Sequence, residues 1–311
     1  MSTPGSSGAT PPPATRHAVR LRTPGGPDNL VMEEIEVPRP GPREVLIRVH
    51  AAAITRDELE WPVDRLPAIP SYELSGVVAA TGPDVTAPSV GDTVFALSPF
   101  DRDGAAADYT VVPAGCLAPK PSSVGHVEAA ALPLAGLSAW QGLFVHGALE
   151  AGQRVVIHGA AGGVGHLACQ LARWRGAHVI GTATGAGVEA ARGFGAHEVV
   201  DRATTRFEDV VGPVDLVFDT VGGDTLARSG AVLREQGRLV SVAEELPEGL
   251  TGTYFVVEPD GEQLAGLARL ADDGALRPAV DSVFPLAEAV KAFERLMAPG
   301  KRGKVVLKVQ G

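Results

Sequence analysis

A glycine-rich segment between a predicted strand and a predicted helix is the strongest chemical feature of the sequence. An apolar run at residues 154–158 leads into GAAGGVG at residues 159–165, and a helical stretch begins at Val164. Closely spaced glycines let the backbone approach a pyrophosphate, whose charge is stabilised at the N-terminus of the helix. Gly165 lets that helix pack closely on the strand. The segment predicts a dinucleotide-binding turn, although the residue inserted after Gly159 departs from strict G-x-G-x-x-G spacing. A tight turn without a ligand is the alternative.

The segment after the next predicted strand indicates which dinucleotide binds. An NAD site should have an acidic residue about 20 residues beyond the glycines, where it holds the ribose 2′-hydroxyl. Residues 181–187 read GTATGAG, and the first acid is Glu189. A 2′-phosphate would therefore meet no repulsion, and Thr182, Thr184 and Arg202 could donate hydrogen bonds to it. We predict NADP(H) as the cofactor, although Arg202 would be explained equally well as a solvated surface side chain.

Composition excludes several functional classes. The 311 residues suffice for about two domains, with 45% hydrophobic and 21% charged residues. No apolar run approaches the roughly 18 residues of a membrane span, so we expect no membrane insertion. The net charge of −10 and the scattered basic residues disfavour a nucleic-acid partner. Two cysteines exclude a disulfide scaffold, and without an export signal we expect a cytoplasmic protein.

The hydrophobic pattern changes along the chain. Residues 1–16 are rich in Pro, Gly, Ser and Thr and are predicted to be a disordered tail. Residues 17–126 contain short apolar runs between Gly and Pro turns, which indicate a β-rich unit. Within residues 127–255, helices near Val164, Val188 and Asp224 alternate with apolar strands, which predicts a doubly wound parallel sheet. Residues 256–311 contain two helical stretches and a final strand.

Several segments, in this order, resemble one family. Gly152-Gln153, AAGGVG, Gln170 and Arg173 look like the family's own motif, and other matching segments are EVLIRVHAAAIT, IPSYELSGVV, VGDTVFAL, AAALPLAGLSAW, DTVGG and RGKVVLKV. From Ala18 to Val309 the chain resembles the zinc-independent quinone oxidoreductases, similar to zeta-crystallin, of the medium-chain dehydrogenase/reductase superfamily. The resemblance implies an α/β fold and commonly a homodimer. It implies a GroES-like catalytic domain at residues 17–126 and 256–311, and a Rossmann NADP-binding domain at residues 127–255.

The sequence departs from the zinc-dependent members of this superfamily. Those alcohol dehydrogenases hold a catalytic zinc with a Cys, a Gly-His-Glu segment and a later Cys. The corresponding positions here hold Thr55 and Ser71-Tyr72-Glu73. Because a thiolate and an imidazole are missing, we expect no tetrahedral zinc site. Without this Lewis acid, an alcohol is not easily converted to an alkoxide at neutral pH, so alcohol dehydrogenase activity is disfavoured.

The resemblance places the remaining candidate residues around a cleft where nicotinamide meets the substrate. Tyr72, Thr55 and Asp57 are the candidate catalytic residues. The Tyr72 hydroxyl could stabilise charge on a carbonyl oxygen, although the ring would serve equally well as a pocket wall. Lys304 either contacts the cofactor or caps the sheet. The turn and the resemblance together predict cofactor contacts at Ser138, Ala161, Gly162, Gly163, Val164, Thr182, Thr184, Arg202, Val221, Val242, Phe255, Val256 and Lys304.

Other polar residues have structural interpretations. We expect His158 to be a hydrogen-bonded structural histidine, His166 to lie on the exposed surface, and Cys169 to pack in the core. Glu58 is expected to form a local pair or cap. The segment Gly136-Leu-Ser-Ala-Trp140 lacks the second glycine of a Gly-x-Ser-x-Gly elbow, so a hydrolase is rejected.

These features favour an NADPH-dependent oxidoreductase that transfers hydride to a small electrophilic acceptor, either a quinone or an α,β-unsaturated carbonyl compound. The cofactor carries the difficult chemistry, and the protein orients and polarises the acceptor. No residue is a compelling proton donor, which favours quinones slightly because their reduced anion is stable. Two alternatives are a non-catalytic NADPH-binding protein with a structural or sensing role, and a reductase of enoyl thioesters.

Overall fold

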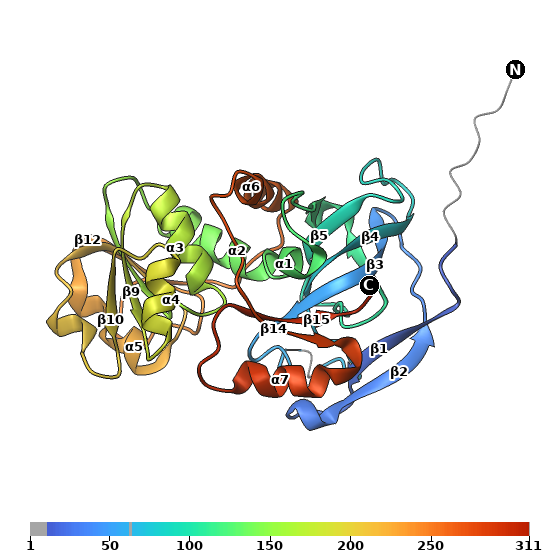
Figure 1. Ribbon diagram of the computed structural model, residues 1–311, viewed down its shortest axis with the longest axis horizontal. Coiled ribbons are helices and arrows are strands. Elements are labelled where there is room, and N and C mark those ends of the chain that lie inside the picture. Colours follow the sequence, from blue (N-terminus) through green and yellow to red (C-terminus); the bar gives the residue numbers. More distant parts are fainter. Residues whose placement is uncertain (1–10, 62–63, 311) are drawn as a thin grey trace, which may run out of the picture.

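The computed structural model describes residues 11–61 and 64–310, which form three β-sheets (Figure 1). The smallest sheet pairs β1 (Thr15–Leu21) with β2 (Leu30–Glu36) in antiparallel orientation. The first ten residues of the predicted tail 1–16 lie outside the described residues. Thr15 and Arg16 already belong to β1, so the first strand begins slightly before the predicted end of the tail.

The seven-stranded sheet joins the two ends of the chain. Its order is β14-β15-β3-β4-β5-β7, and β6 pairs with the N-terminal half of β3. The last strand, β15, runs antiparallel to β3, with Val306 opposite Ala53. The final segment GKVVLKV therefore forms a strand as predicted, and it lies between β14 and β3 in the β-rich sheet. The strand bounds are β3 (Glu44–Ile54), β4 (Glu73–Thr81), β5 (Thr93–Leu97), β6 (Tyr109–Pro113), β7 (Leu117–Pro119), β14 (Val280–Pro285) and β15 (Lys304–Lys308).

The six-stranded sheet is parallel throughout and has the order β10-β9-β8-β11-β12-β13. The chain fills one side of β8 with β9 and β10 and then crosses to β11 and β12. This reversal creates a topological switch point between β8 and β11, where ligands bind in open α/β sheets. The expected doubly wound fold is thus confirmed. The strand bounds are β8 (Arg154–His158), β9 (His178–Ala183), β10 (Glu198–Asp201), β11 (Val214–Asp219), β12 (Leu233–Ser241) and β13 (Thr253–Tyr254).

Helices cover both faces of the parallel sheet and connect it to the β-rich unit (Figure 1). Pro133 is the first residue of α2, where proline fits because its missing N–H would have no helical partner. Helix α2 packs against α3 and α6, and α7 packs against β14 and β15. The helix bounds are α1 (His126–Ala130), α2 (Pro133–Trp140), the π-helix η3 (Gln141–His146), α3 (Gly165–Trp174), α4 (Gly187–Gly193), α5 (Gly223–Arg228), α6 (Gly261–Asp272) and α7 (Ala289–Met297). Short 3-10 helices are η1 (Pro27–Asn29), η2 (Ala114–Cys116), η4 (Phe207–Asp209), η5 (Ser229–Val232) and η6 (Leu286–Glu288).

Gly165 sets the distance between α3 and the end of β8. A Cβ atom at this position would lie 2.1 Å from the carbonyl oxygen of Gly159. Backbone cannot move aside as a flexible side chain can, so only glycine fits. The close packing predicted for this residue is therefore present, and it keeps the helix N-terminus near the turn.

Replacing Gly165 with alanine should destabilise the fold by about 1–3 kcal/mol, because the added methyl group overpacks the turn. Urea unfolding of the wild type and the variant measures this change. Gly193→Ala is the matched control, because its Cβ would meet no atom within 4 Å at the end of α4. Equal losses of stability in the two variants would contradict the packing argument.

Candidate functional site

The glycine turn lies at the switch point and is covered by the last part of the chain. The Gly303 N–H donates to the carbonyl of Ala161 at 3.1 Å. A Cβ atom on Gly163 would lie 3.2 Å from Cδ of Lys304, so glycine leaves the room that this lysine takes up. Val164 is the N-cap of α3. The predicted cofactor residues Ala161, Gly162, Gly163 and Val164 thus form one backbone cradle at a helix N-terminus, which fits a pyrophosphate.

The carboxyl ends of β11 and β12 form the adjoining edge. Asp219 is fully buried and accepts hydrogen bonds from the N–H groups of Val221 and Gly222 and from the Ser241 hydroxyl. Burial raises the pKa of this carboxyl group. The Val242 N–H donates to the Asp219 carbonyl, and the Phe255 N–H donates to that of Ser241.

Two of the predicted residues on this edge leave apolar surface open to a ligand. Val221 is 39% exposed and Val256 is 57% exposed, whereas Phe255 is buried. Ser138, on α2, is buried, and its hydroxyl lacks a hydrogen-bond partner within the described chain. A buried polar atom without a partner is costly, so this hydroxyl suits contact with a bound group. The cradle, the apolar edge and this hydroxyl together fit a dinucleotide.

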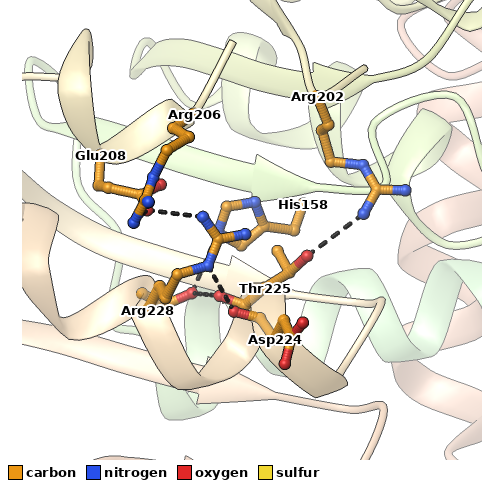
Figure 2. A network of polar contacts seen from close by, with 8 residues as sticks. His158, Arg202, Arg206, Glu208, Asp224, Thr225 and Arg228 are labelled. Carbon is orange, nitrogen blue, oxygen red and sulfur yellow. Dashed lines mark hydrogen bonds and ion pairs between the residues drawn. The ribbon is translucent and has the colours of Figure 1, made fainter. Parts of the chain in front are cut away.

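Beyond this edge, three arginines line a cavity of about 310 Å³ (Figure 2). Arg202 follows β10 and donates to the Thr225 hydroxyl at 3.2 Å. Arg206 and Arg228 both bind the same oxygen of Glu208. The complete lining consists of Thr184, Arg202, Thr205, Arg206, Phe207, Asp224, Thr225 and Arg228. Arg202 and Thr184, both predicted to lie near a ribose phosphate, therefore share one cavity.

The structure does not support the role predicted for Thr182. Its side chain is fully buried, and its hydroxyl lies 3.0 Å from Nδ1 of His158. Thr182 lies inside β9, whereas Thr184 follows the end of this strand and lines the cavity. The second ring nitrogen of His158 lies 3.1 Å from the Ser229 hydroxyl. Burial lowers the pKa of His158 to about 3, so this histidine is neutral and structural, as predicted.

Sequence reasoning missed Arg206 and Arg228, although a signal was present. Both residues follow strands of the parallel sheet, one after β10 and one in the helix after β11. Because the carboxyl ends of parallel strands meet at one edge, basic residues in these two segments could have been expected near Arg202.

The candidate catalytic residue Tyr72 lies in an aromatic cluster. Its hydroxyl accepts a hydrogen bond from Arg65 at 3.0 Å, and burial raises the pKa of the phenol. Its ring centroid lies 5.7 Å from that of Trp61 and 5.3 Å from that of Phe100. Trp61 is 38% exposed, so the cluster has a solvent-facing side. The cluster can act as an aromatic wall that carries one charge-assisted hydroxyl group.

Thr55 contacts a buried ion pair. Lys304 forms a salt bridge with Glu73, and both side chains are almost completely buried. The Lys304 ammonium donates to the Thr55 hydroxyl at 2.8 Å, and the Thr55 hydroxyl donates weakly to Glu73 at 3.4 Å. The second Glu73 oxygen accepts from the Leu134 N–H at 3.0 Å. Thr55 and Lys304 are therefore brought together, whereas Asp57 is exposed on the loop after β3.

His166 is buried, so the prediction of an exposed side chain is wrong. Its Nδ1 donates to the Gly162 carbonyl at 3.0 Å, and its Nε2 accepts from the Ala279 N–H at 2.9 Å. The ring thus joins the glycine turn to the chain segment that leads into β14. The prediction failed because Ala279 lies 113 residues away in the sequence. Cys169 is fully buried in the core, as predicted.

Within residues 11–61 and 64–310, no group of three His, Cys, Asp or Glu side chains could hold a metal ion. None of the helices in this part of the chain is long and apolar enough to cross a membrane.

Comparisons with known proteins support one family. Residues 41–122 match the alcohol dehydrogenase GroES-like domain, and residues 194–307 match a family described as zinc-binding dehydrogenase. The chain is 33% identical over 303 residues to a probable zinc-binding oxidoreductase of Arthroderma benhamiae, covering 88% of this chain and 91% of the relative. It is 33% identical over 301 residues to the NADPH-dependent alkenal/one oxidoreductase of Arabidopsis thaliana, and the match covers 91% of this chain and 77% of the relative.

A solved structure has the same architecture. The quinone oxidoreductase of Coxiella burnetii superposes with a TM-score of 0.88 at 30% identity. The match covers 95% of this chain and 100% of that chain. The resemblance noted in the sequence is thus supported by relatives, family models and fold.

The buried His166 should make stability depend on pH. Burial lowers its pKa to about 4, so below pH 6.5 the unfolded chain takes up a proton before the folded chain does. Its contribution is complete above pH 6.5 and is lost as the pH falls toward 4, by about 2 kcal/mol at pH 5. Urea unfolding should show His166→Gln to be less stable than the wild type at pH 7, with a smaller difference at pH 5. The same difference at both pH values would refute this linkage.

Proposed function

The chain belongs to the medium-chain dehydrogenase/reductase superfamily, and we propose that it is a zinc-independent oxidoreductase that uses NADPH to reduce a quinone or an α,β-unsaturated carbonyl compound. The observation that carries the cofactor preference is the arginine-lined cavity at the carboxyl edge of the parallel sheet. The zinc independence is inferred from Thr55 and Ser71-Tyr72-Glu73, which stand where zinc-dependent members of the superfamily have zinc ligands.

The cavity supports NADPH because its charge and position suit a 2′-phosphate. Thr184 directly follows β9, at the position where an NAD site would carry an acidic residue, and it lines the cavity together with Arg202. The Arg202 guanidinium has one hydrogen bond within the described chain, to the neutral Thr225 hydroxyl. Its other donors can therefore bind a phosphate without first breaking an ion pair. Hydrogen bonds between charged groups of this kind are short and strong.

The contacts of Thr55 and Tyr72 support a reaction without zinc. In place of a thiolate and an imidazole, the site has a hydroxyl bound to Lys304 and a phenol bound to Arg65. Neither group is a usual zinc ligand. The Lys304 ammonium, paired with Glu73, supplies positive charge next to Thr55 without a metal. Polarised hydroxyl groups of this kind can stabilise negative charge that develops on an acceptor oxygen.

The aromatic cluster supports a flat acceptor. Tyr72, Trp61 and Phe100 contact one another through tilted and edge-on ring pairs. Aromatic groups of this kind pack well against conjugated planar molecules. NADPH, when bound, supplies the hydride. The chain's own residues hold the cofactor, pack against the acceptor and polarise its oxygen. Two relatives in the comparisons are named for quinone and alkenal/one acceptors, in agreement with this class.

We also propose a catalytic domain of residues 17–126 with 256–311 and an NADP-binding domain of residues 127–255. The sheet membership of the strands supports this division. β13 ends the parallel sheet at Tyr254, while β14 and β15 pair with the β-rich sheet.

The acceptor class is tested by the loss of NADPH absorbance when ortho-quinones, para-quinones or simple enones are added, with NADH in parallel. We expect acceptor-dependent oxidation of NADPH and much slower oxidation of NADH, because no acidic residue follows β9, where an NAD site has one. NADPH binding without oxidation by any acceptor would instead indicate a non-catalytic binding protein.

The cofactor preference is tested by Arg202→Ala. Loss of a charged hydrogen bond to phosphate costs about 1.5–3 kcal/mol, so the dissociation constant for NADPH should rise roughly 10- to 100-fold. The constant for NADH should change little, as measured by quenching of protein fluorescence. Arg192→Ala is the control, because Arg192 lies on α4 outside the cavity and pairs with Glu189. Equal weakening of both cofactors by Arg202→Ala would argue against a phosphate contact.

A further inference from the structure

The guanidinium group of Arg228 is a second fixed cation in the cavity that Arg202 lines. Arg228 is the last residue of α5. Its Nε donates to the Asp224 carbonyl at 2.9 Å, and its Nη1 donates to the Glu208 carboxylate at 2.6 Å (Figure 2). Its central carbon lies 5.4 Å from the centroid of the Phe207 ring, and a ring face attracts a cation at this distance. These three contacts hold the guanidinium group in one orientation.

This orientation leaves one amino group of Arg228 available to a ligand. Within residues 11–61 and 64–310, the Nη2 group donates to no side chain and to no carbonyl oxygen. The side chain is 39% exposed, so solutes can reach it. A guanidinium group that is already ordered loses little further freedom when it binds an anion. Its planar arrangement of donors also matches the oxygen atoms of a phosphate group.

Helix α5 brings Arg228 next to the group that binds Arg202. The Arg202 guanidinium donates to the Thr225 hydroxyl at 3.2 Å (Figure 2). Thr225 and Arg228 lie three residues apart on α5, and side chains at this spacing are neighbours on the surface of a helix. The two guanidinium groups therefore approach the cavity from adjacent positions. Their two positive charges match the nearly two negative charges of a phosphate monoester at neutral pH.

The carboxylates around the cavity make a second arginine necessary for a phosphate. One Glu208 oxygen binds both Arg206 and Arg228. Partial removal from water would raise the pKa of Glu208, but hydrogen bonds from its own N–H and from the two arginines lower it to about 2. This single ionised group neutralises only one of the two guanidinium groups. Asp224 is the acid among the lining residues, and it repels a phosphate that only Arg202 would hold.

We propose that Arg228 is a second arginine that binds the 2′-phosphate of NADPH, and that Arg202 and Arg228 together set the preference for NADPH over NADH. This inference rests on the proposed function and adds a specificity-determining residue to it. Arg202 follows β10, whereas Arg228 belongs to the helix after β11, so the phosphate is bound from two separate elements of the sheet edge. Each contact is a hydrogen bond between charged groups, which is stronger than one between neutral groups.

The decisive variant is Arg228→Met, which removes the charge and keeps an unbranched side chain. We expect the dissociation constant for NADPH to rise roughly 10- to 100-fold, because a charged hydrogen bond to the phosphate is lost. The constant for NADH should change little, and this value also shows that the variant is folded. Arg228→Lys keeps the charge but not the planar donors, so it should restore part of the affinity for NADPH. Quenching of protein fluorescence measures both constants.

Arg206→Met is the matched control, because it removes the same charge from the lining of the same cavity. Arg206 directs its Nε and Nη2 to Glu208 and is 66% exposed, so we expect this variant to weaken NADPH binding much less than Arg228→Met does. Equal weakening by the two variants would indicate a general effect of charge and would overturn the proposal. The double variant Arg202→Ala with Arg228→Met should bind NADPH and NADH with similar affinity, because neither phosphate contact remains.

Because these measurements need no turnover, they separate this proposal from the proposed reaction. A wild type that prefers NADPH, together with an Arg228→Met variant that keeps the same preference, would overturn the role of Arg228 and leave the proposed function standing. A wild type that binds NADPH through Arg228 but oxidises it with no acceptor would refute the proposed reductase and support the phosphate contact. Equal affinity of the wild type for NADPH and NADH would overturn both the cofactor preference and the role of Arg228.

Discussion

The buried ammonium of Lys304 is the interaction on which the site depends. It pairs with Glu73 from β4, binds Thr55 at the end of β3, and lies against Gly163 of the cofactor turn. A lysine in this environment is stable only with its partners in place, and loss of one partner of a buried pair costs about 3–5 kcal/mol. The same cation therefore links β15 with β3 and β4 next to the glycine turn and sets the charge beside the proposed acceptor.

Local patterns, together with the resemblance to one family, were sufficient to predict most of the fold. The strand at 154–158, the glycine turn and the start of α3 are determined by neighbouring residues, and their positions agree with the sequence analysis. The fate of single polar side chains was harder to predict. Thr182 lies inside β9, whereas Thr184 lies just beyond the end of that strand, and His166 is buried by a residue 113 positions away. The burial of Glu58 likewise depends on Ser71, a contact across two loops that no periodicity reveals.

The distribution of charge also differs from what the net charge suggests. The chain has a formal net charge of −10, yet three arginines line one cavity. Fixed cations that converge at the edge of a sheet create a local positive potential, even on an acidic protein. Arg206 and Arg228 share Glu208, so Arg202 is the arginine of this cavity whose charge has no carboxylate partner in the described chain.

The long sequence separation within the Lys304 cluster has a consequence for folding kinetics. Thr55 and Lys304 are 249 residues apart, whereas the strands of the parallel sheet are joined by much shorter crossovers. Contacts between distant residues require a large loss of chain entropy before they become favourable, and they slow folding. The parallel sheet can therefore form early, while docking of β15 against β3 comes late. Until that docking occurs, Glu73 lacks its partner Lys304. A chain arrested before this step would also expose the edge of β3 that β15 covers, and it would be prone to aggregation.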